Sequence, residues 1–170
     1  MNAVKLAYAV LVAAAVAIVA VPAALAEERK CRESLNAVTV DNLKVPRGAT
    51  CTLNGTKVKG TIKVGRGATL FATNIKVVGN IQAENHERVV VNGMRSRVGG
   101  SIQIVQGGSA TIRNVKVKGD MQLFENDDAI VVSTNRVDGN LQCKENDPEP
   151  TGGGNLVEGN AEDQCEDLEV

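Results

Sequence analysis

Apolar and polar positions alternate along most of this chain, and the alternation returns in a fixed motif about every twenty residues. The motif reads valine, any residue, glycine and a small polar residue. An apolar residue, Gln or Lys, and a second apolar residue follow. The five complete copies occupy residues 58–64, 77–83, 98–104, 117–123 and 137–143, and partial copies stand at 42–45 and 157–160.

Self-similarity at this period, with glycine punctuation and β-branched residues, is typical of a stacked β-solenoid. Because side chains alternate along a strand, each coil adds one residue to every inward column. Two columns come from the motif: Leu43, Ile62, Ile81, Ile102, Met121, Leu141, and Val45, Val64, Ala83, Ile104, Leu123, Cys143. A second strand gives Cys51, Leu70, Val91, Ile112, Val131, and a short third strand gives Val58, Val77, Val98, Val117, Val137, Val157.

The sequence therefore predicts an all-β fold, a single-stranded parallel β-helix of about six coils of 19–21 residues. Spacings of 19, 21, 19, 20 and 20 between the motif glycines break the multiple of six that left-handed hexapeptide helices keep, and favour a right-handed helix. We expect the glycines at corners, with φ > 0, and the small polar residue after each one to hydrogen-bond along the stack.

The start of the chain has the pattern of a signal peptide: a basic start at 1–5, an apolar run at 6–21 and a small-x-small site before Glu27. An uncleaved membrane anchor is the alternative. We expect cleavage after Ala26, an N-terminal cap at 27–41, coils at 42–159, and a C-terminal cap with an acidic tail at 160–170. The protein is then secreted or periplasmic, and its mature chain has no membrane span.

Four cysteines in an exported chain predict two disulfides. Cys31 precedes Cys51 by one coil, and Cys143 precedes Cys165 by about one coil. Adjacent strands lie about 4.8 Å apart, which is close enough for a bridge. We predict Cys31–Cys51 and Cys143–Cys165 as staples at the two ends. A Cys-based zinc or redox site is the alternative, but there is no CxxC and only one histidine.

Charge is divided along the chain. Residues 42–118 carry thirteen Lys and Arg against two Glu, and residues 119–170 carry fourteen Asp and Glu against two basic residues. Before each inward valine of the third strand stands a basic residue, and these make an outward column of Lys57, Lys76, Arg97, Lys116 and Arg136. Like charges at strand spacing repel unless an anionic ligand lies along them, which predicts a uronate, teichoic-type or lipopolysaccharide ligand. A solvated face is the alternative.

Two further sets of polar residues are candidates. An outward column of Lys44, Lys63, Gln82, Gln103, Gln122 and Gln142 can form an amide ladder, which either stabilises the stack or makes an adhesive face. The acidic turns offer a weak calcium candidate from Glu125, Asp127, Asp128, Glu145 and Asp147, although no spacing matches a calcium loop. His86 stands in a variable turn and is expected at the surface.

With these motifs, the chain resembles small exported bacterial parallel β-helix repeat proteins, which generally have no assigned function. The resemblance covers about residues 36–165 and is carried by the Gly-(Asn/Ser)-φ-Gln-φ coils, where φ is apolar, and the closing segment at 140–146. A weaker likeness is to bactofilins, which are cytosolic β-helices that polymerise end to end. Polysaccharide lyases share the fold but have more coils.

The leading functional hypothesis is a non-enzymatic structural or anionic-glycan-binding module of the cell envelope, without a cofactor. Self-association of the basic end with the acidic end is a second hypothesis, and a lyase-like enzyme is a third. No nucleophile elbow, metal-ligand pair or phosphate loop is present. Nucleic acid is not expected as a partner, because export removes the protein from DNA and no aromatic residues for base stacking are interleaved with the basic residues.

Overall fold

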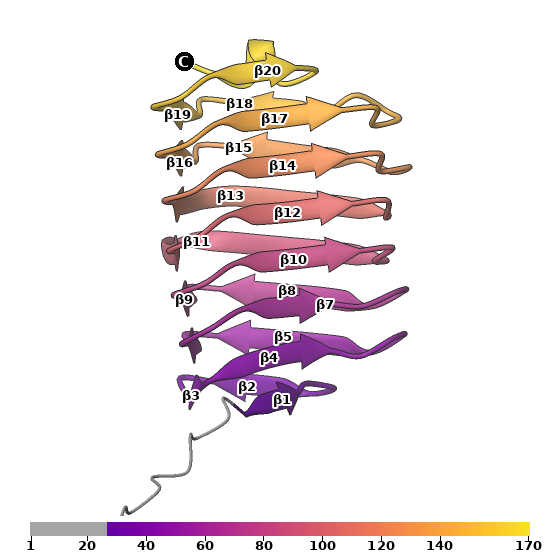
Figure 1. Cartoon of the computed structure of the whole chain (residues 1–170), viewed down its shortest axis with the longest axis vertical. Helices are drawn as coiled ribbons and strands as arrows, with labels where there is room; N and C mark the ends of the chain where they lie inside the picture. Colours follow the sequence, from indigo (N-terminus) through magenta and orange to yellow (C-terminus); the bar gives the residue numbers. More distant parts are fainter. Residues whose placement is uncertain (1–26) are drawn as a thin grey trace, which may run out of the picture.

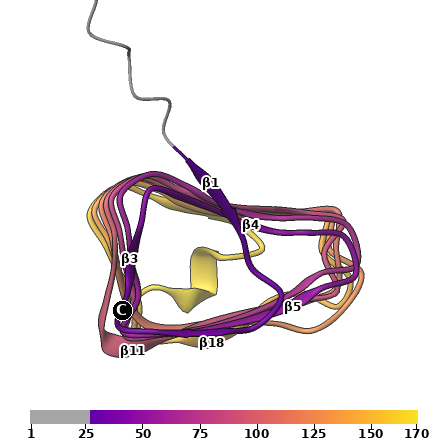
Figure 2. The same ribbon diagram turned by 90° about the horizontal axis from the view of Figure 1, so that it is seen from below.

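A computed structural model describes residues 27–170, and it shows an all-β solenoid of about seven stacked turns (Figure 1). The predicted signal peptide, residues 1–26, lies outside the described residues. Viewed along the stack, each turn has three sides (Figure 2). All strand pairs between turns are parallel, so the predicted fold class is confirmed. The hand of the helix stays a prediction.

Side A is an eight-stranded sheet formed by the motif strands. Its strands are β1 (Glu28–Lys30), β4 (Asn42–Val45), β7 (Ile62–Val64), β10 (Ile81–Glu84), β12 (Ile102–Val105), β14 (Met121–Phe124), β17 (Leu141–Lys144) and β20 (Ala161–Asp163). The two predicted inward columns of this side are in register and buried.

Sides B and C form one twelve-stranded sheet, because β11 (Arg88–Val98) and β13 (Ser109–Val117) continue round the corner between them. Side B also has β2 (Ser34–Asn36), β5 (Thr50–Asn54), β8 (Thr69–Thr73), β15 (Ile130–Ser133) and β18 (Thr151–Gly153). The short side C has β3 (Thr39–Val40), β6 (Lys57–Val58), β9 (Lys76–Val77), β16 (Arg136–Val137) and β19 (Leu156–Val157). The predicted valine column of side C is buried throughout.

The predicted inward column of side B is wrong in part. Two columns point inward here: Cys51, Leu70, Val89, Ala110, Ile130, and Leu35, Leu53, Ala72, Val91, Ile112, Val132. The predicted column mixes them and places Val131 inside, whereas Val131 points outward opposite Thr111. The reason is that residues 125–129 contain one residue more than the matching turn at 106–109.

The motif glycines do not have positive φ, which corrects that prediction. The left-handed residues lie at the other corners, for example Gly55 at 66° and Asn74 at 53°. The motif needs glycine because the neighbouring turn approaches closely. A Cβ on Gly139 would lie less than 3.0 Å from Asp120 Oδ1 and from the Gly119 carbonyl.

The small polar residues after the motif glycines form the predicted hydrogen-bonded ladder. Each side-chain oxygen accepts the backbone N–H of its counterpart one turn later, at 2.8–3.3 Å. The ladder runs through Asn42, Thr61, Asn80, Ser101, Asp120, Asn140 and Asn160. It aligns one corner of every turn and therefore holds the register of sides A and C.

Both ends of the core are covered. The predicted disulfides Cys31–Cys51 and Cys143–Cys165 are confirmed, with Cα–Cα distances of 5.5 and 5.2 Å. Residues 27–41 are themselves a short coil of three strands, which accounts for about seven turns rather than six. At the other end, the 3₁₀ helix η1 (Glu166–Leu168) lies over the core and buries Leu168 (Figure 2).

Candidate binding face

Side C presents two outward columns of side chains, because each of its strands has one outward residue before the inward valine and one after it. The first column, in strand register, is Thr39, Lys57, Lys76, Arg97, Lys116, Arg136 and Leu156. The second column consists of the residues that follow each valine. From the second turn on, the backbone N–H of each of these residues donates to the carbonyl oxygen of the valine one turn earlier. The column contains Asp41, Lys59, Val78, Gly99, Lys118, Asp138 and Glu158. All five residues of the predicted basic column therefore lie on one face.

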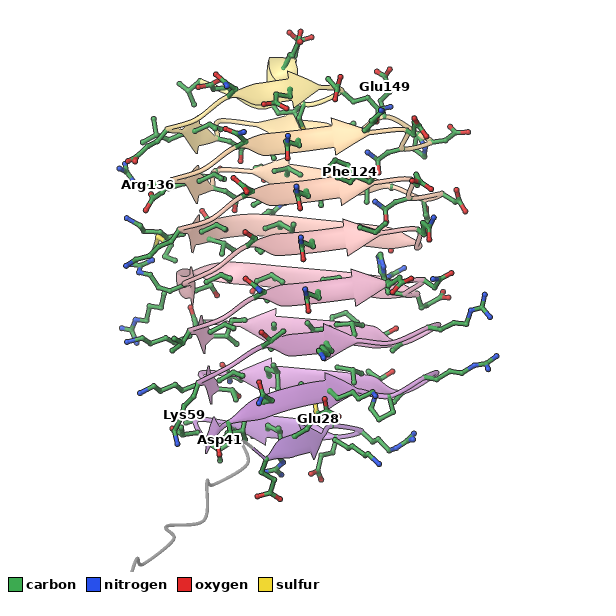
Figure 3. All side chains as sticks on the ribbon, viewed as in Figure 1. Glu28, Asp41, Lys59, Phe124, Arg136 and Glu149 are labelled. Atoms are coloured by element: carbon green, nitrogen blue, oxygen red, sulfur yellow. A yellow bond between two sulfur atoms is a disulfide. The ribbon has the colours of Figure 1, made fainter. Side chains whose placement is uncertain are left out.

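Ion pairs close both ends of this face. At the lower end of Figure 3, Lys59 Nζ lies 2.8 Å from Asp41 Oδ1, and this contact holds the pKa of the Asp41 carboxyl below its usual value. At the upper end, Arg136 pairs with Asp138 at 3.3 Å and with Glu158. Lys116 Nζ lies 3.5 Å from Asp138 Oδ2. Lys116 and Arg136 belong to the predicted basic column, and these carboxylates partly neutralise their charges.

Four cations remain between these ends, and they are called the basic strip: Lys57, Lys76, Arg97 and Lys118. Among residues 27–170, none of the four has a carboxylate within 4.0 Å. Their side chains are exposed. Strand pairing holds Lys57, Lys76 and Arg97 one turn apart in the first column, and Lys118 stands in the second column one turn beyond Arg97. The strip is therefore a fixed row of positive charge in which adjacent members repel one another.

A hollow of about 510 Å³ lies in the middle of the strip. Its walls are Lys76, Arg97, Lys116 and Lys118, and its floor includes Val78 and Gly99. The hollow exists because the second column has only a short side chain and a glycine at these two turns. Gly99 is required there, since a Cβ would lie less than 3.0 Å from the Val78 carbonyl oxygen. Val78 is 52% exposed, so the floor is apolar and open to solvent.

A bulge in β11 flanks the hollow. The pairing of β11 with β13 shifts register between Asn92 and Ser96, and the extra residues leave Met94 80% exposed. The Arg97 guanidinium donates from Nη1 to the carbonyl oxygens of Met94 and Ser96, both at 3.4 Å. These bonds turn the Arg97 head group toward the bulge.

The predicted Gln and Lys column lies on side A, and most of its side chains are uncharged amides. Four glutamines donate along the stack at 2.7–3.0 Å: Gln82 to Gln103, Gln103 to Gln122, Gln122 to Gln142, and Gln142 to Glu162. The lower members of the column are Lys44 and Lys63. A hollow of about 590 Å³ runs along this ladder, and its lining includes Phe124; Figure 3 labels this residue. The amides have one another as partners, so the ladder already has a structural role.

The acidic turns are not gathered into a metal site. Glu125 accepts from Gln106 Nε2 at 2.8 Å, Asp128 accepts the N–H of Ala129 at 2.7 Å, and Glu145 lies 3.8 Å from Lys144 Nζ. Within residues 27–170, no group of three or more His, Cys, Asp and Glu side chains is placed to hold a metal ion.

His86 is buried rather than at the surface, and this corrects the prediction. Its side chain folds into the stack beneath Gly107, where a Cβ would collide with the imidazole ring. It is 3% exposed, and neither ring nitrogen has a hydrogen-bond partner among the described residues. Burial lowers the pKa of His86 below its usual value. Turns 84–87 and 105–108 have equal lengths, so His86 lies opposite Gly107. A histidine aligned with a glycine one turn later could have indicated from the sequence that the ring is buried.

Comparisons with family models, curated proteins and solved structures found no match to the chain. Its two disulfides indicate an oxidising environment, extracellular or periplasmic. In the described part of the chain, no helix has the length and apolarity needed to cross a membrane.

Proposed function

We propose that this protein is an exported, non-enzymatic β-solenoid that binds an anionic polymer of the cell envelope through the basic strip. The observation that supports the proposal is the row of exposed cations that have no carboxylate partner within residues 27–170, with an open hollow in its middle. Four repelling charges held at strand spacing destabilise the free protein slightly, and a polyanion along the row removes that repulsion.

The stack gives this row rigidity. Each cation follows or precedes a buried valine whose strand pairs on both sides, so the spacing of the charges does not depend on a ligand. Because the backbone of this face is already ordered, ligand binding costs conformational entropy in the side chains but not in the backbone. Ionic contacts of this exposed kind are weakened by salt.

The test is retention on columns of immobilised anionic polysaccharides during a salt gradient. The variant Lys57→Gln/Lys76→Gln/Arg97→Gln/Lys118→Gln removes the strip. The matched control, Lys44→Gln/Lys63→Gln/Arg66→Gln/Arg113→Gln, removes the same charge from elsewhere on the surface. We expect the wild type and the control to elute late from at least one polymer and the strip variant to elute early. Equal elution of all three proteins would reject the proposal.

Head-to-tail self-association is a second candidate, and the outward column of side A favours it. In strand register this column begins with Lys30, Lys44 and Lys63, continues through the glutamines and ends with Glu162. Stacking one rod on the next would place the carboxylate end beside the lysine end. Light scattering at high concentration tests this. Association should fall with salt and with Glu162→Lys, and return with Glu162→Lys/Lys30→Glu. A monomer at every salt concentration excludes it.

A further inference from the structure

The length of the basic strip limits the length of ligand it can contact. The strip begins one turn above Thr39 and ends at Lys118, and the turns on either side contain the ion pairs of Asp41 and Asp138. Four successive turns therefore offer cations to a ligand. Three steps of about 4.8 Å give a contact length of roughly 14 Å along the rod.

The spacing of the strip discriminates between polyanions. Successive cations in the first column are one strand apart, about 4.8 Å. Each strand of a DNA duplex has one charge per about 3.4 Å along the helix axis, so its phosphates would fall out of step within a few residues. A pyranose chain linked equatorially through positions 1 and 4 advances by about one strand spacing per ring. If each ring has one carboxylate, the chain offers one charge per turn of the rod; these charges alternate between its two edges, and the long Lys and Arg side chains of the strip reach either edge.

The hollow adds a second criterion, which is shape. Its floor is apolar at Val78 and Gly99, and its walls are cationic. A sugar ring has an apolar face of C–H groups and, in a uronate, a carboxylate at its edge. Seated over Val78, such a ring buries its C–H face while its carboxylate reaches Lys76 or Lys118. A flexible chain of phosphodiesters has no comparable flat apolar face.

Resting on the proposed function, we propose that side C binds a linear 1,4-linked polyuronate parallel to the rod, with about four sugar residues in contact and one ring over Val78 and Gly99. Carboxylates of successive rings then lie beside Lys57, Lys76, Arg97 and Lys118. Rings beyond the fourth meet the ion pairs of Asp41 at one end or of Asp138 and Glu158 at the other, where the cations are already paired with carboxylates of the protein.

The experiment is calorimetry with purified oligomannuronates from dimer to octamer, with inorganic polyphosphate as a polyanion of different spacing. We expect affinity to rise steeply up to the tetramer and then to change by less than about twofold, apart from the statistical gain of longer chains. The variant Val78→Gln fills the hollow without changing charge, and should weaken tetramer binding by about tenfold or more. Val90→Gln, on side B, is the control and should bind as the wild type does.

Separate outcomes distinguish this inference from the proposed function. If the affinity keeps rising in proportion to length up to the octamer, or if Val78→Gln binds the tetramer as well as wild type, the four-residue site is overturned while polymer binding stands. Tighter binding of polyphosphate than of oligouronates at equal charge overturns the uronate assignment. If neither probe binds at low salt, both this inference and the proposed function fail.

Discussion

A buried amide ladder inside the turns is predicted to contribute more stability than the exposed glutamine ladder on side A. Asn126 is fully buried. Its Oδ1 accepts the N–H of Gly107 at 3.2 Å, and its Nδ2 donates to the Ile104 carbonyl at 3.2 Å and to Asn146 Oδ1 at 2.8 Å. Asn146 in turn bonds to Gln164. These side chains join successive turns where the chain leaves side A.

The substitution Asn126→Ala removes three hydrogen bonds and leaves the Gly107 N–H without this acceptor. Asn146 Oδ1 keeps the backbone N–H of residue 126 as a donor, so it is not orphaned. An unsatisfied buried donor costs about 1–3 kcal/mol, and lost bonds add about 1 kcal/mol. The expected loss in the free energy of unfolding is therefore about 2–4 kcal/mol. Gln122→Ala removes two hydrogen bonds of the exposed ladder, but water can replace the lost partners at that site, and we expect a loss below about 1 kcal/mol.

Urea unfolding followed by circular dichroism, with both disulfides intact, measures the two losses under the same conditions. The comparison is internal, since both variants replace an amide side chain by Ala in neighbouring positions of one turn. Two results would refute the reasoning: an Asn126→Ala loss below about 1 kcal/mol, or a Gln122→Ala loss as large as that of Asn126→Ala. Either result would mean that burial does not decide which ladder stabilises the stack.

Three further predictions concern stability. The folded state lowers the pKa of His86, the only histidine, so the unfolded chain binds more protons as pH falls below about 6.5. The contribution of His86 to the free energy of unfolding should be fully present above this pH and should decrease toward about pH 5.5, by at most about 1.4 kcal/mol per pH unit. Chemical unfolding at several pH values measures this, and the free energy of unfolding of His86→Leu should depend less on pH. Gly139→Ala should destabilise by about 1–3 kcal/mol through steric overlap, and Gly65→Ala, whose Cβ would have its nearest neighbour at 3.2 Å, by less; equal melting temperatures would contradict this. Cys143→Ser/Cys165→Ser should cost about 3 kcal/mol in thermal unfolding, and reductant should then have a smaller effect than on wild type.

The sequence predicted sides A and C more accurately than side B for a physical reason. The motif places a close-packed glycine and a hydrogen-bonding residue at the corner between C and A, and these fix the register of the strands on either side of it. Side B is reached through turns of variable length. The additional residue near Asp128 shifts the strand by one position, and in a strand a one-residue shift exchanges inward and outward faces. This is why Ile130 and Val132, rather than Val131, are buried.

The sequence predicted the first outward column of the candidate face, but it predicted neither Lys118 as a member of the strip nor the ion pairs of Lys116 and Arg136. Lys57, Lys76 and Arg97 could be aligned because each stands one position before a motif valine. Nothing in the sequence indicated the second outward column, because its members are acidic, basic, apolar and glycine residues and follow no common pattern. Only the structure shows that Asp138 reaches Lys116 and Arg136, and that the short residues in this column open a hollow.

Ligand mapping by NMR tests the central claim most directly. Backbone amide shifts of the mature chain are followed while an oligomannuronate tetramer is added at low salt. We predict that the shifted amides lie on side C, in β6, in β9 and in the parts of β11 and β13 that include Arg97 and Lys116, and that Lys57→Gln/Lys76→Gln/Arg97→Gln/Lys118→Gln abolishes the shifts. Shifts confined to side A or to the turns, or persisting in that variant, would contradict the assignment of the binding face.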